Sequence, residues 1–228
     1  MKLAELENRE LEGAISGNSR VVYNPYLESK KKRALDVLGA CAVGLALLPG
    51  IIFALVGLSL QRGPVTFRHV RLGKGGRYFP CRKFRTMVVG ADQKLKQLLE
   101  ADPAARREWE RDFKLKNDPR VTTVGRLLRR TSFDELPQLL HVLFGDMSLS
   151  GPRPIVDAEF SRYKGSGKYY LACKPGLTGL WQASGRSDVS YFRRVAMDRA
   201  YAEKASFCLD LKIIFLTAVA VLKFKGAY

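Results

Sequence analysis

The sequence predicts an α+β protein, mainly helical, that attaches to a membrane from one side through a hairpin of two helices. Three observations predict this monotopic fold class. An uncharged stretch, residues 37–60, has a proline and a glycine at its midpoint. Helical spacing of apolar residues recurs along most of the remaining chain. Residues 63–87 instead show the pattern of two short strands around a glycine-rich turn, which predicts a small β-hairpin.

Residues 37–60 could cross a bilayer by length alone, because one helix of this size is about 36 Å long and the hydrocarbon core is about 30 Å thick. Pro49 and Gly50 predict a sharp kink at the midpoint, however. Basic residues flank both ends, as "KKKR" before the stretch and Arg62 after it, which places both ends on the cytoplasmic side. We therefore favour a re-entrant helix–break–helix hairpin over residues 30–62. A spanning helix and the buried helix of a soluble protein are the alternatives.

The other segments have simpler patterns. Residues 1–29 form a polar extension, and the glycines at 73–76 suit a hairpin turn because they lack the G-x-x-x-x-G-K-[ST] spacing of a phosphate loop. The apolar residues 213–222 are too short to span a bilayer and predict an amphipathic helix in the membrane interface. Further helices are expected at residues 3–11, 91–113 with a break at Asp102-Pro103, 124–130, and from Leu136 onward.

The charge is strongly positive, with a formal net value of +17 for 228 residues. Residues 1–29 are net acidic, so the whole excess lies in residues 30–228. Such a bias predicts a polyanionic partner, which could be nucleic acid, an anionic membrane or a phosphorylated small molecule. The long apolar stretch makes nucleic acid the weakest of these. Four cysteines without C-x-x-C spacing favour reduced thiols in a cytoplasm-facing protein.

Two adjacent carboxylates, Asp134 and Glu135, stand beside an arginine cluster in "RRTSFDELPQ". In a purely structural interpretation, Ser132 and Glu135 form a capping box and Asp134 is an N-cap. In a catalytic interpretation, the helix N-terminus and Arg129 lower the pKa of Asp134 and keep it ionised. An ionised, oriented carboxylate can attack phosphorus to give an acyl phosphate. Arginines and usually Mg²⁺ would balance the phosphate charge.

Five segments in order resemble the bacterial sugar transferases, which are monotopic phosphoglycosyl transferases. The segments are "KFRTM", "RRTSFDELPQL", "GDMSLSGPRP", "KPGLTGLWQASGR" and the terminal "LDLKIIFLTAVAVLKFKGAY". The resemblance covers about residues 30–228 and implies a two-step reaction at the cytoplasmic face of the bacterial inner membrane. Asp134 would attack a UDP-sugar and release UMP, and undecaprenyl phosphate would then accept the sugar phosphate, as the first membrane step of exopolysaccharide synthesis.

The resemblance also implies roles for individual residues. Glu135 would hold Mg²⁺ or take a proton from the acceptor. Substrate-binding residues would be Lys83, Arg85, Arg129, Arg153, Gln182 and Arg186, and the metal ligands would be Asp134, Glu135 and Asp146. Each has a structural alternative. Asp146 suits a turn or cap equally well, and Lys83 and Arg85 alternate as on any solvated strand face.

The implied organisation has three parts: the extension 1–29, the hairpin 30–62, and a catalytic domain 63–228 that works with the hairpin as one unit. The partners would be UDP-sugar, undecaprenyl phosphate and membrane lipid, without nucleic acid, and the interfacial helices leave room for a homodimer. The alternative from another class is a basic membrane-associated adaptor without catalysis. Nothing in the residues selects the sugar.

Overall fold

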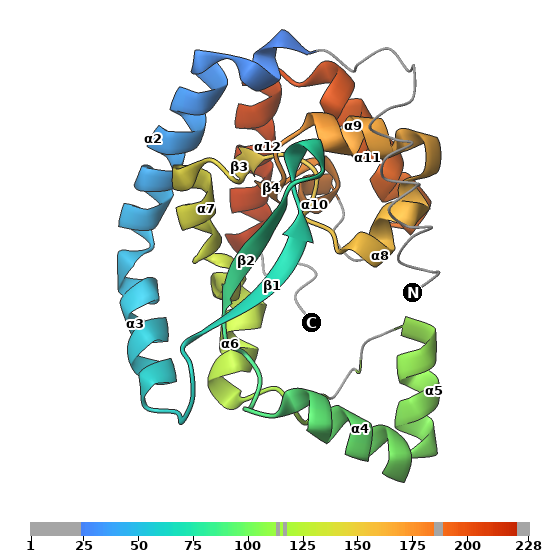
Figure 1. Cartoon of the computed structure of the whole chain (residues 1–228). Helices are drawn as coiled ribbons and strands as arrows, with labels where there is room; N and C mark the ends of the chain where they lie inside the picture. The colour runs from blue at the N-terminus through green and yellow to red at the C-terminus, as the bar shows by residue number, and fades with distance from the viewer. Residues whose placement is uncertain (1–23, 113–114, 116–117, 185–188, 223–228) are drawn as a thin grey trace. The chain divides into compact units, whose positions relative to one another are not determined.

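The computed structural model describes residues 24–112, 115, 118–184 and 189–222 and is mostly helical (Figure 1). The chain divides into two compact units. The first unit contains the described residues of Met1–Ala46, Arg68–Arg82 and Pro137–Gly226. The second contains those of Leu47–Phe67 and Lys83–Leu136.

Helices make up most of both units. Those of the first unit are η1 (Pro25–Glu28), α2 (Lys30–Ala46), η2 (Lys74–Gly76), α7 (Gln138–Phe144), α8 (Asp157–Phe160), η4 (Ser161–Ser166), α9 (Gly167–Ala172), α10 (Leu180–Ser184), α11 (Tyr191–Lys204) and α12 (Phe207–Leu222). Those of the second are α3 (Leu48–Ser59), α4 (Ala91–Ala101), α5 (Pro103–Asp112), α6 (Thr123–Thr131) and η3 (Phe133–Glu135).

Within the described residues, four strands form two small sheets. β1 (Thr66–Leu72) pairs with β2 (Tyr78–Phe84), and β3 (Ser148–Ser150) pairs in parallel with β4 (Gly176–Thr178). In the second sheet Ser148 lies opposite Gly176 and Ser150 opposite Thr178. Gly176 is required there, because a Cβ would overlap the backbone of Gly151. The β3–β4 sheet lies in the first unit, where α2, α7 and α12 pack against it.

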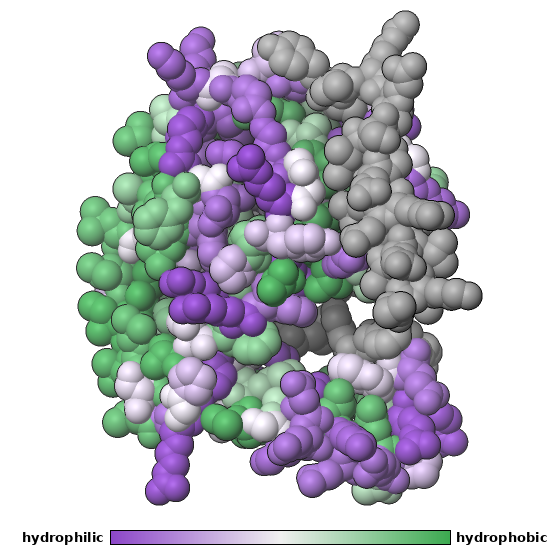
Figure 2. Space-filling view, in the orientation of Figure 1, coloured by the Kyte–Doolittle hydropathy of each residue, from purple (hydrophilic) through white to green (hydrophobic). Residues whose placement is uncertain are grey.

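The second unit is built around α3, which packs against α6 and η3. The buried residues Ala54 and Leu58 define the inner face of α3, with 0% exposure each. The outer face is apolar and exposed, with Ile52, Phe53 and Val56 at 52–55%. Figure 2 shows this apolar surface over α3. The inner and outer faces of α3 are therefore both apolar, so the helix is not amphipathic.

The local predictions for strands and surface helices are confirmed. β1 and β2 flank the predicted turn, where Gly75 and Gly76 have φ of 63° and 79°, in the left-handed region that glycine adopts readily. α4 and α5 are separated at Asp102, whose Oδ1 accepts a hydrogen bond of 2.8 Å from the backbone N–H of Ala104. The aspartate therefore starts the second helix of the predicted pair.

The C-terminal helix is longer than predicted, since α12 begins at Phe207 and not near residue 213. The backbone N–H of Asp210 donates to the Ser206 carbonyl at 3.0 Å, which forms the first turn. Asp210 is completely buried, so the added turn is part of the core. This turn belongs to the helix because Asp210 contacts residues distant in sequence, and the local hydropathy pattern does not predict it. The helix predicted at residues 3–11 lies outside the described residues.

At the midpoint of the apolar stretch the chain bends. In the described part of the chain no single helix has the length and apolar character needed to cross a membrane, whereas α2 and α3 reach the threshold together and are bent by 64° at the break. Pro49 lies in the first turn of α3, where its missing N–H costs no helical hydrogen bond. The proline therefore begins a second helix after the break, as the hairpin prediction requires.

Candidate active site

The two acids lie in a short 3₁₀ turn between α6 and α7. At the end of α6, Ser132 has φ of 60° and ψ of 18°, and its N–H donates to the Arg129 carbonyl at 3.1 Å. The turn η3 follows at once, and the Leu136 N–H donates to the Phe133 carbonyl at 3.1 Å. A left-handed serine directly before a 3₁₀ turn redirects the chain, so that Asp134 and Glu135 are presented next to the end of α6.

The capping interpretation of the two acids is wrong. The N-cap position of η3 is Ser132, and its side chain makes no capping hydrogen bond. The N-cap position of α7 is Pro137, which has no side-chain donor or acceptor. The left-handed conformation of Ser132 excludes the extended geometry that an N-cap serine needs. The carboxylates are thus not accounted for by helix capping.

Lys83 is placed between the two carboxylates. From β2, its Nζ lies 2.5 Å from Glu135 Oε1 and 4.0 Å from Asp134 Oδ2. The side chains of Asp134, Glu135 and Lys83 are 15%, 26% and 29% exposed, so the cluster is half-buried but reachable. Lys83 is thus shared by the two carboxylates.

Burial raises the pKa of Asp134 to about 6, and the negative charge of Glu135 acts in the same direction. Lys83 and Arg129 lower this pKa, but by less. The prediction of a lowered pKa was therefore wrong, because the loss of hydration and a second carboxylate outweigh the two cations. At pH 7 about nine-tenths of the carboxylate is still ionised, and it is more basic than an exposed aspartate.

Arg129 reaches the same region from the last turn of α6. Its Nε donates to Thr86 Oγ1 at 2.9 Å, in the segment that follows β2. The helix approaches this segment closely at Gly125, where a Cβ would overlap the Thr86 carbonyl. The backbone contact and the side-chain hydrogen bond together hold Arg129 beside the acids, where its charge acts on Asp134.

Arg85 is turned toward the end of α3. It is 8% exposed, and its Nη1 donates to the Arg62 carbonyl at 2.9 Å. A substituent on Gly63 would overlap this guanidinium. Lys83 lies in β2 and Arg85 just beyond its last residue, and they make different contacts. Lys83 pairs with the acids, and Arg85 binds carbonyls just beyond the C-terminus of α3.

The remaining predicted residues belong to the first unit. Arg153 is exposed and its Cζ lies 6.0 Å from the centroid of the Trp181 ring. Gln182 follows on α10 with its Oε1 buried and without a hydrogen-bond partner. Asp146 Oδ2 lies 3.0 Å from Nδ1 of His141. Arg186 lies outside the described residues. The structure thus brings together Asp134, Glu135, Lys83 and Arg129.

Of the three predicted metal ligands, Asp134 and Glu135 are adjacent in η3, and Asp146 belongs to the first unit. Among the described residues no group of three or more His, Cys, Asp or Glu side chains could hold a metal ion. Two adjacent carboxylates nevertheless suit Mg²⁺, which usually takes one or two protein carboxylates together with water and substrate phosphates. Asp134 and Glu135 fit that donor set.

A second polar cluster, which the sequence prediction missed, lies wholly in the first unit. Lys32 Nζ lies 2.6 Å from Asp210 Oδ2 and 3.3 Å from Asp36 Oδ1. Tyr201 donates from its hydroxyl to Asp210 Oδ1 at 2.8 Å, and Ser148 donates from its hydroxyl to Asp36 Oδ1 at 2.9 Å. These bonds join α2, β3, α11 and α12. Only the i,i+4 spacing of Lys32 and Asp36 could have indicated it from sequence.

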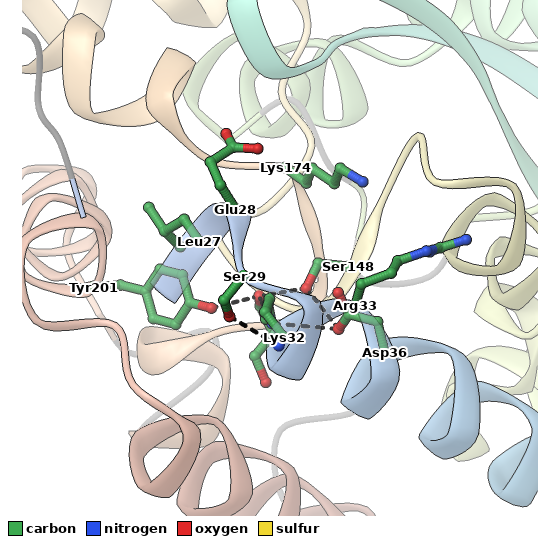
Figure 3. A pocket seen from close by; sticks show the side chains of 10 residues that line it. Leu27, Glu28, Ser29, Lys32, Arg33, Asp36, Ser148, Lys174 and Tyr201 are labelled. Carbon is green, nitrogen blue, oxygen red and sulfur yellow. Dashed lines mark hydrogen bonds and ion pairs between the residues drawn. The ribbon is translucent and has the colours of Figure 1, made fainter. Parts of the chain in front are cut away.

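This cluster borders a cavity of about 200 Å³, shown in Figure 3. In Figure 3, Lys32, Asp36 and Ser148 are joined by dashed lines, and Lys174 and Glu28 are set apart from them. Burial and the charge of Arg33 lower the pKa of Lys174. None of the predicted site residues lines the cavity. The lining residues are Leu27, Glu28, Ser29, Lys32, Arg33, Asp36, Ser148, Ser150, Lys174 and Tyr201.

Comparison with known proteins identifies the class. Residues 27–224 match the bacterial sugar transferase family, and the chain belongs to this family. The chain is 50% identical over 197 residues to the undecaprenyl-phosphate galactose phosphotransferase of Salmonella typhimurium. That match covers 86% of this chain and 41% of the relative, so the chain spans about two-fifths of its length.

Two shorter relatives are covered more completely. The exopolysaccharide production protein ExoY of Sinorhizobium fredii is 46% identical over 199 residues, which are 86% of this chain and 88% of that protein. A UDP-glucose:undecaprenyl-phosphate glucose-1-phosphate transferase of Caulobacter vibrioides is 38% identical over 207 residues, which are 87% of this chain and 72% of that protein. The predicted family resemblance and the enzyme class, a transferase, are confirmed.

Proposed function

We propose that this chain transfers a sugar-1-phosphate from a UDP-sugar to undecaprenyl phosphate, and so starts exopolysaccharide assembly. The observation that supports this most directly is the half-buried pair of Asp134 and Glu135 held by Lys83 in a member of the sugar transferase family. The printed names of relatives include both a galactose and a glucose transferase. The proposal therefore leaves the sugar open and fixes the donor as a UDP-sugar.

In the first step, a carboxylate oxygen of Asp134 attacks the sugar-bearing phosphorus of the UDP-sugar. The bond between this phosphorus and the bridging oxygen breaks, UMP leaves with the electron pair, and an aspartyl sugar-phosphate remains. A pKa of about 6 leaves the carboxylate ionised at pH 7 and makes it a better nucleophile than an exposed aspartate.

In the second step, a phosphate oxygen of undecaprenyl phosphate attacks the same phosphorus. The bond from phosphorus to the aspartyl oxygen breaks, which restores the carboxylate and gives undecaprenyl-diphosphate-sugar. The acceptor is mostly ionised at pH 7, because its second pKa is about 6. At pH 7 most acceptor molecules therefore carry no proton for Glu135 to remove.

Charge balance is the main task of the surrounding residues. Lys83 and Arg129 face the acids and would bind the phosphate groups as they approach. We assign the same role to Arg153, with Gln182 and Arg186 on the nucleotide or sugar. Mg²⁺, held by Asp134 and Glu135, would neutralise charge on the transferred phosphate. Asp146 is a weaker candidate ligand, because His141 already contacts its carboxylate.

The membrane arrangement belongs to the same proposal. One substrate is soluble and the other carries a long polyprenyl chain, so the reaction must occur at headgroup depth. A re-entrant hairpin of α2 and α3 on the cytoplasmic face of the inner membrane would achieve this, supported by their bend and by the exposed apolar face of α3. Thiol labelling of cysteines introduced at positions 28 and 66 should report the same side. Opposite sides would mean a spanning helix.

The decisive test of the proposed activity is UMP release. Purified protein in detergent is mixed with undecaprenyl phosphate, Mg²⁺ and each member of a panel of UDP-sugars, and UMP is measured. We expect release with at least one UDP-sugar and formation of the lipid-linked product. No release with any member of the panel would favour the non-catalytic adaptor. Gel filtration of the same sample would test the predicted homodimer.

A further inference from the structure

The residue before the proposed nucleophile contacts the break in the membrane hairpin. Phe133 begins the turn η3, and its ring lies against Gly50, in the first turn of α3 next to Pro49. A Cβ built on Gly50 would lie 2.9 Å from both Cδ2 and Cζ of the ring and would overlap Cε2. Real Cβ atoms do not approach other atoms this closely, so a side chain at position 50 would require the Phe133 ring to move.

This contact is specific to one end of α3. Gly57 occupies the same face two turns later, but a Cβ there would meet the methyls of Val124 at 3.5 and 3.8 Å. Such distances are ordinary van der Waals contacts. The helix therefore needs glycine beside Phe133 and tolerates a larger residue beside Val124. Gly50, the buried Ala54 and Gly57 are spaced i, i+4 and i+7, so they share one face of α3 within the second unit.

Other contacts also hold the turn η3, which packs on α6 and whose Glu135 pairs with Lys83. The turn is three residues long and follows a residue in the left-handed conformation, and its backbone bonds are the 3.3 Å bond from the Glu135 N–H to the Ser132 carbonyl and the bond that ends at Leu136. A short 3₁₀ turn has weak hydrogen-bond geometry. The seating of the Phe133 ring on α3 is therefore one of the contacts that set where the adjacent Asp134 carboxylate lies.

We infer that Phe133 and Gly50 are positioning residues, which set the depth of Asp134 relative to the hairpin break. The inference rests on the proposed function, in which Asp134 reacts with a lipid-borne acceptor. Shifting the ring would displace the carboxylate from both the acceptor phosphate and Lys83. The rate should then fall while nucleotide binding persists, because neither Phe133 nor Gly50 carries a charge that would bind the donor phosphates.

The test compares Gly50→Ala with Gly57→Ala. Helix propensity favours alanine over glycine at both positions, so propensity alone predicts that both substitutions raise the stability of the protein. We expect Gly50→Ala to lower kcat by about tenfold to a hundredfold, as a misplacement near 1 Å does, while KM for the UDP-sugar changes by less than about threefold. Gly57→Ala should keep kcat within about twofold of the parent. Equal kcat values for the two variants would overturn the inference.

Rescue distinguishes positioning from general damage. Phe133→Leu shortens the ring side chain and makes room for the new methyl, so the double variant should regain at least about threefold in kcat over Gly50→Ala. A defect that Phe133→Leu does not relieve would contradict the inference.

Two further outcomes are informative. If Gly50→Ala does not fold, Phe133→Ala replaces it, with an expected loss of kcat in a protein that keeps its thermal unfolding transition; unchanged kcat would overturn the inference. If the parent and Gly57→Ala release no UMP at all, the proposed function fails instead. An active parent with a fully active Gly50→Ala variant would contradict only the positioning role.

Discussion

Two lysines of this chain each face a pair of carboxylates, in different surroundings. Lys32 lies between Asp36 and Asp210, and the three residues are 4%, 2% and 0% exposed. Lys83 faces Asp134 and Glu135 and remains 29% exposed. The same residue types thus form a closed cluster in one unit and an open one in the other.

The difference lies in how completely the carboxylates are hydrogen-bonded. Asp210 accepts from Lys32, from the Tyr26 hydroxyl at 2.8 Å and from the Tyr201 hydroxyl at 2.8 Å. Asp134 is approached by Lys83 only to 4.0 Å, and its pKa is raised to about 6. A fully bonded carboxylate stabilises the fold, whereas an incompletely balanced one is available for chemistry.

Removing the carboxylate of the open cluster should have the largest effect. We expect Asp134→Asn to lower turnover at least about a thousandfold, because it removes the nucleophile. The same change should not destabilise the protein at pH 8. The raised pKa means that the ionised aspartate favours unfolding above about pH 6, by up to about 3 kcal/mol, and asparagine carries no charge. UMP release and thermal unfolding measure the two effects.

An active Asp134→Asn enzyme would contradict the assignment of the open cluster to catalysis. An inactive variant that is also unfolded at pH 8 would show that this cluster is structural as well.

In the closed cluster, a substitution should lower the stability of the protein. Lys32→Met leaves Asp36 and Asp210 buried without their cation and should lower the free energy of unfolding by about 3–5 kcal/mol. Lys31→Met is the matched control, because this neighbour is exposed. We expect its stability to stay within about 0.5 kcal/mol of the parent. Denaturant titration in detergent measures both, and equal stabilities would remove the distinction between the clusters.

A smaller effect is expected from the lysine of the open cluster. For the parent, kcat should fall about tenfold per pH unit below an inflection near pH 6, as Asp134 becomes protonated. Lys83 lowers the pKa of Asp134, so Lys83→Met should move the inflection to higher pH. The loss of activity relative to the parent is therefore greater at pH 6 than at pH 8. Lys94→Met, at an exposed position on α4, should leave the inflection unchanged.

An inflection that does not move in Lys83→Met would mean that this lysine does not act on the reacting carboxylate.

Local features of the fold could be predicted from sequence. The β1–β2 turn follows from its glycines, and the break between α4 and α5 follows from Asp102 and Pro103, because these preferences act within a few residues. The bend between α2 and α3 was likewise predicted from Pro49. The adjacent acids and Lys83 were identified as candidates from their motifs, and the structure places them together.

Features that depend on distant contacts could not be predicted. The sign of the Asp134 pKa shift depends on burial, which a motif does not report. The bond between Lys32 and Asp210 joins residues 178 positions apart. The predicted capping box was wrong because Ser132 adopts the left-handed conformation at the end of α6, which the local sequence did not indicate. The glycine requirement at Gly50 arises in the same way, from the ring of Phe133.

The central claim is that Asp134 becomes covalently linked to a sugar phosphate. The direct measurement is mass spectrometry of the intact protein and of its peptides. The enzyme is incubated with UDP-sugar and Mg²⁺ and is quenched before acceptor is added. We predict a mass increase of one sugar-phosphate on the peptide that contains Asp134, its loss on addition of undecaprenyl phosphate, and its absence in Asp134→Asn. UMP release without such an adduct, or an adduct on another residue, would contradict the account.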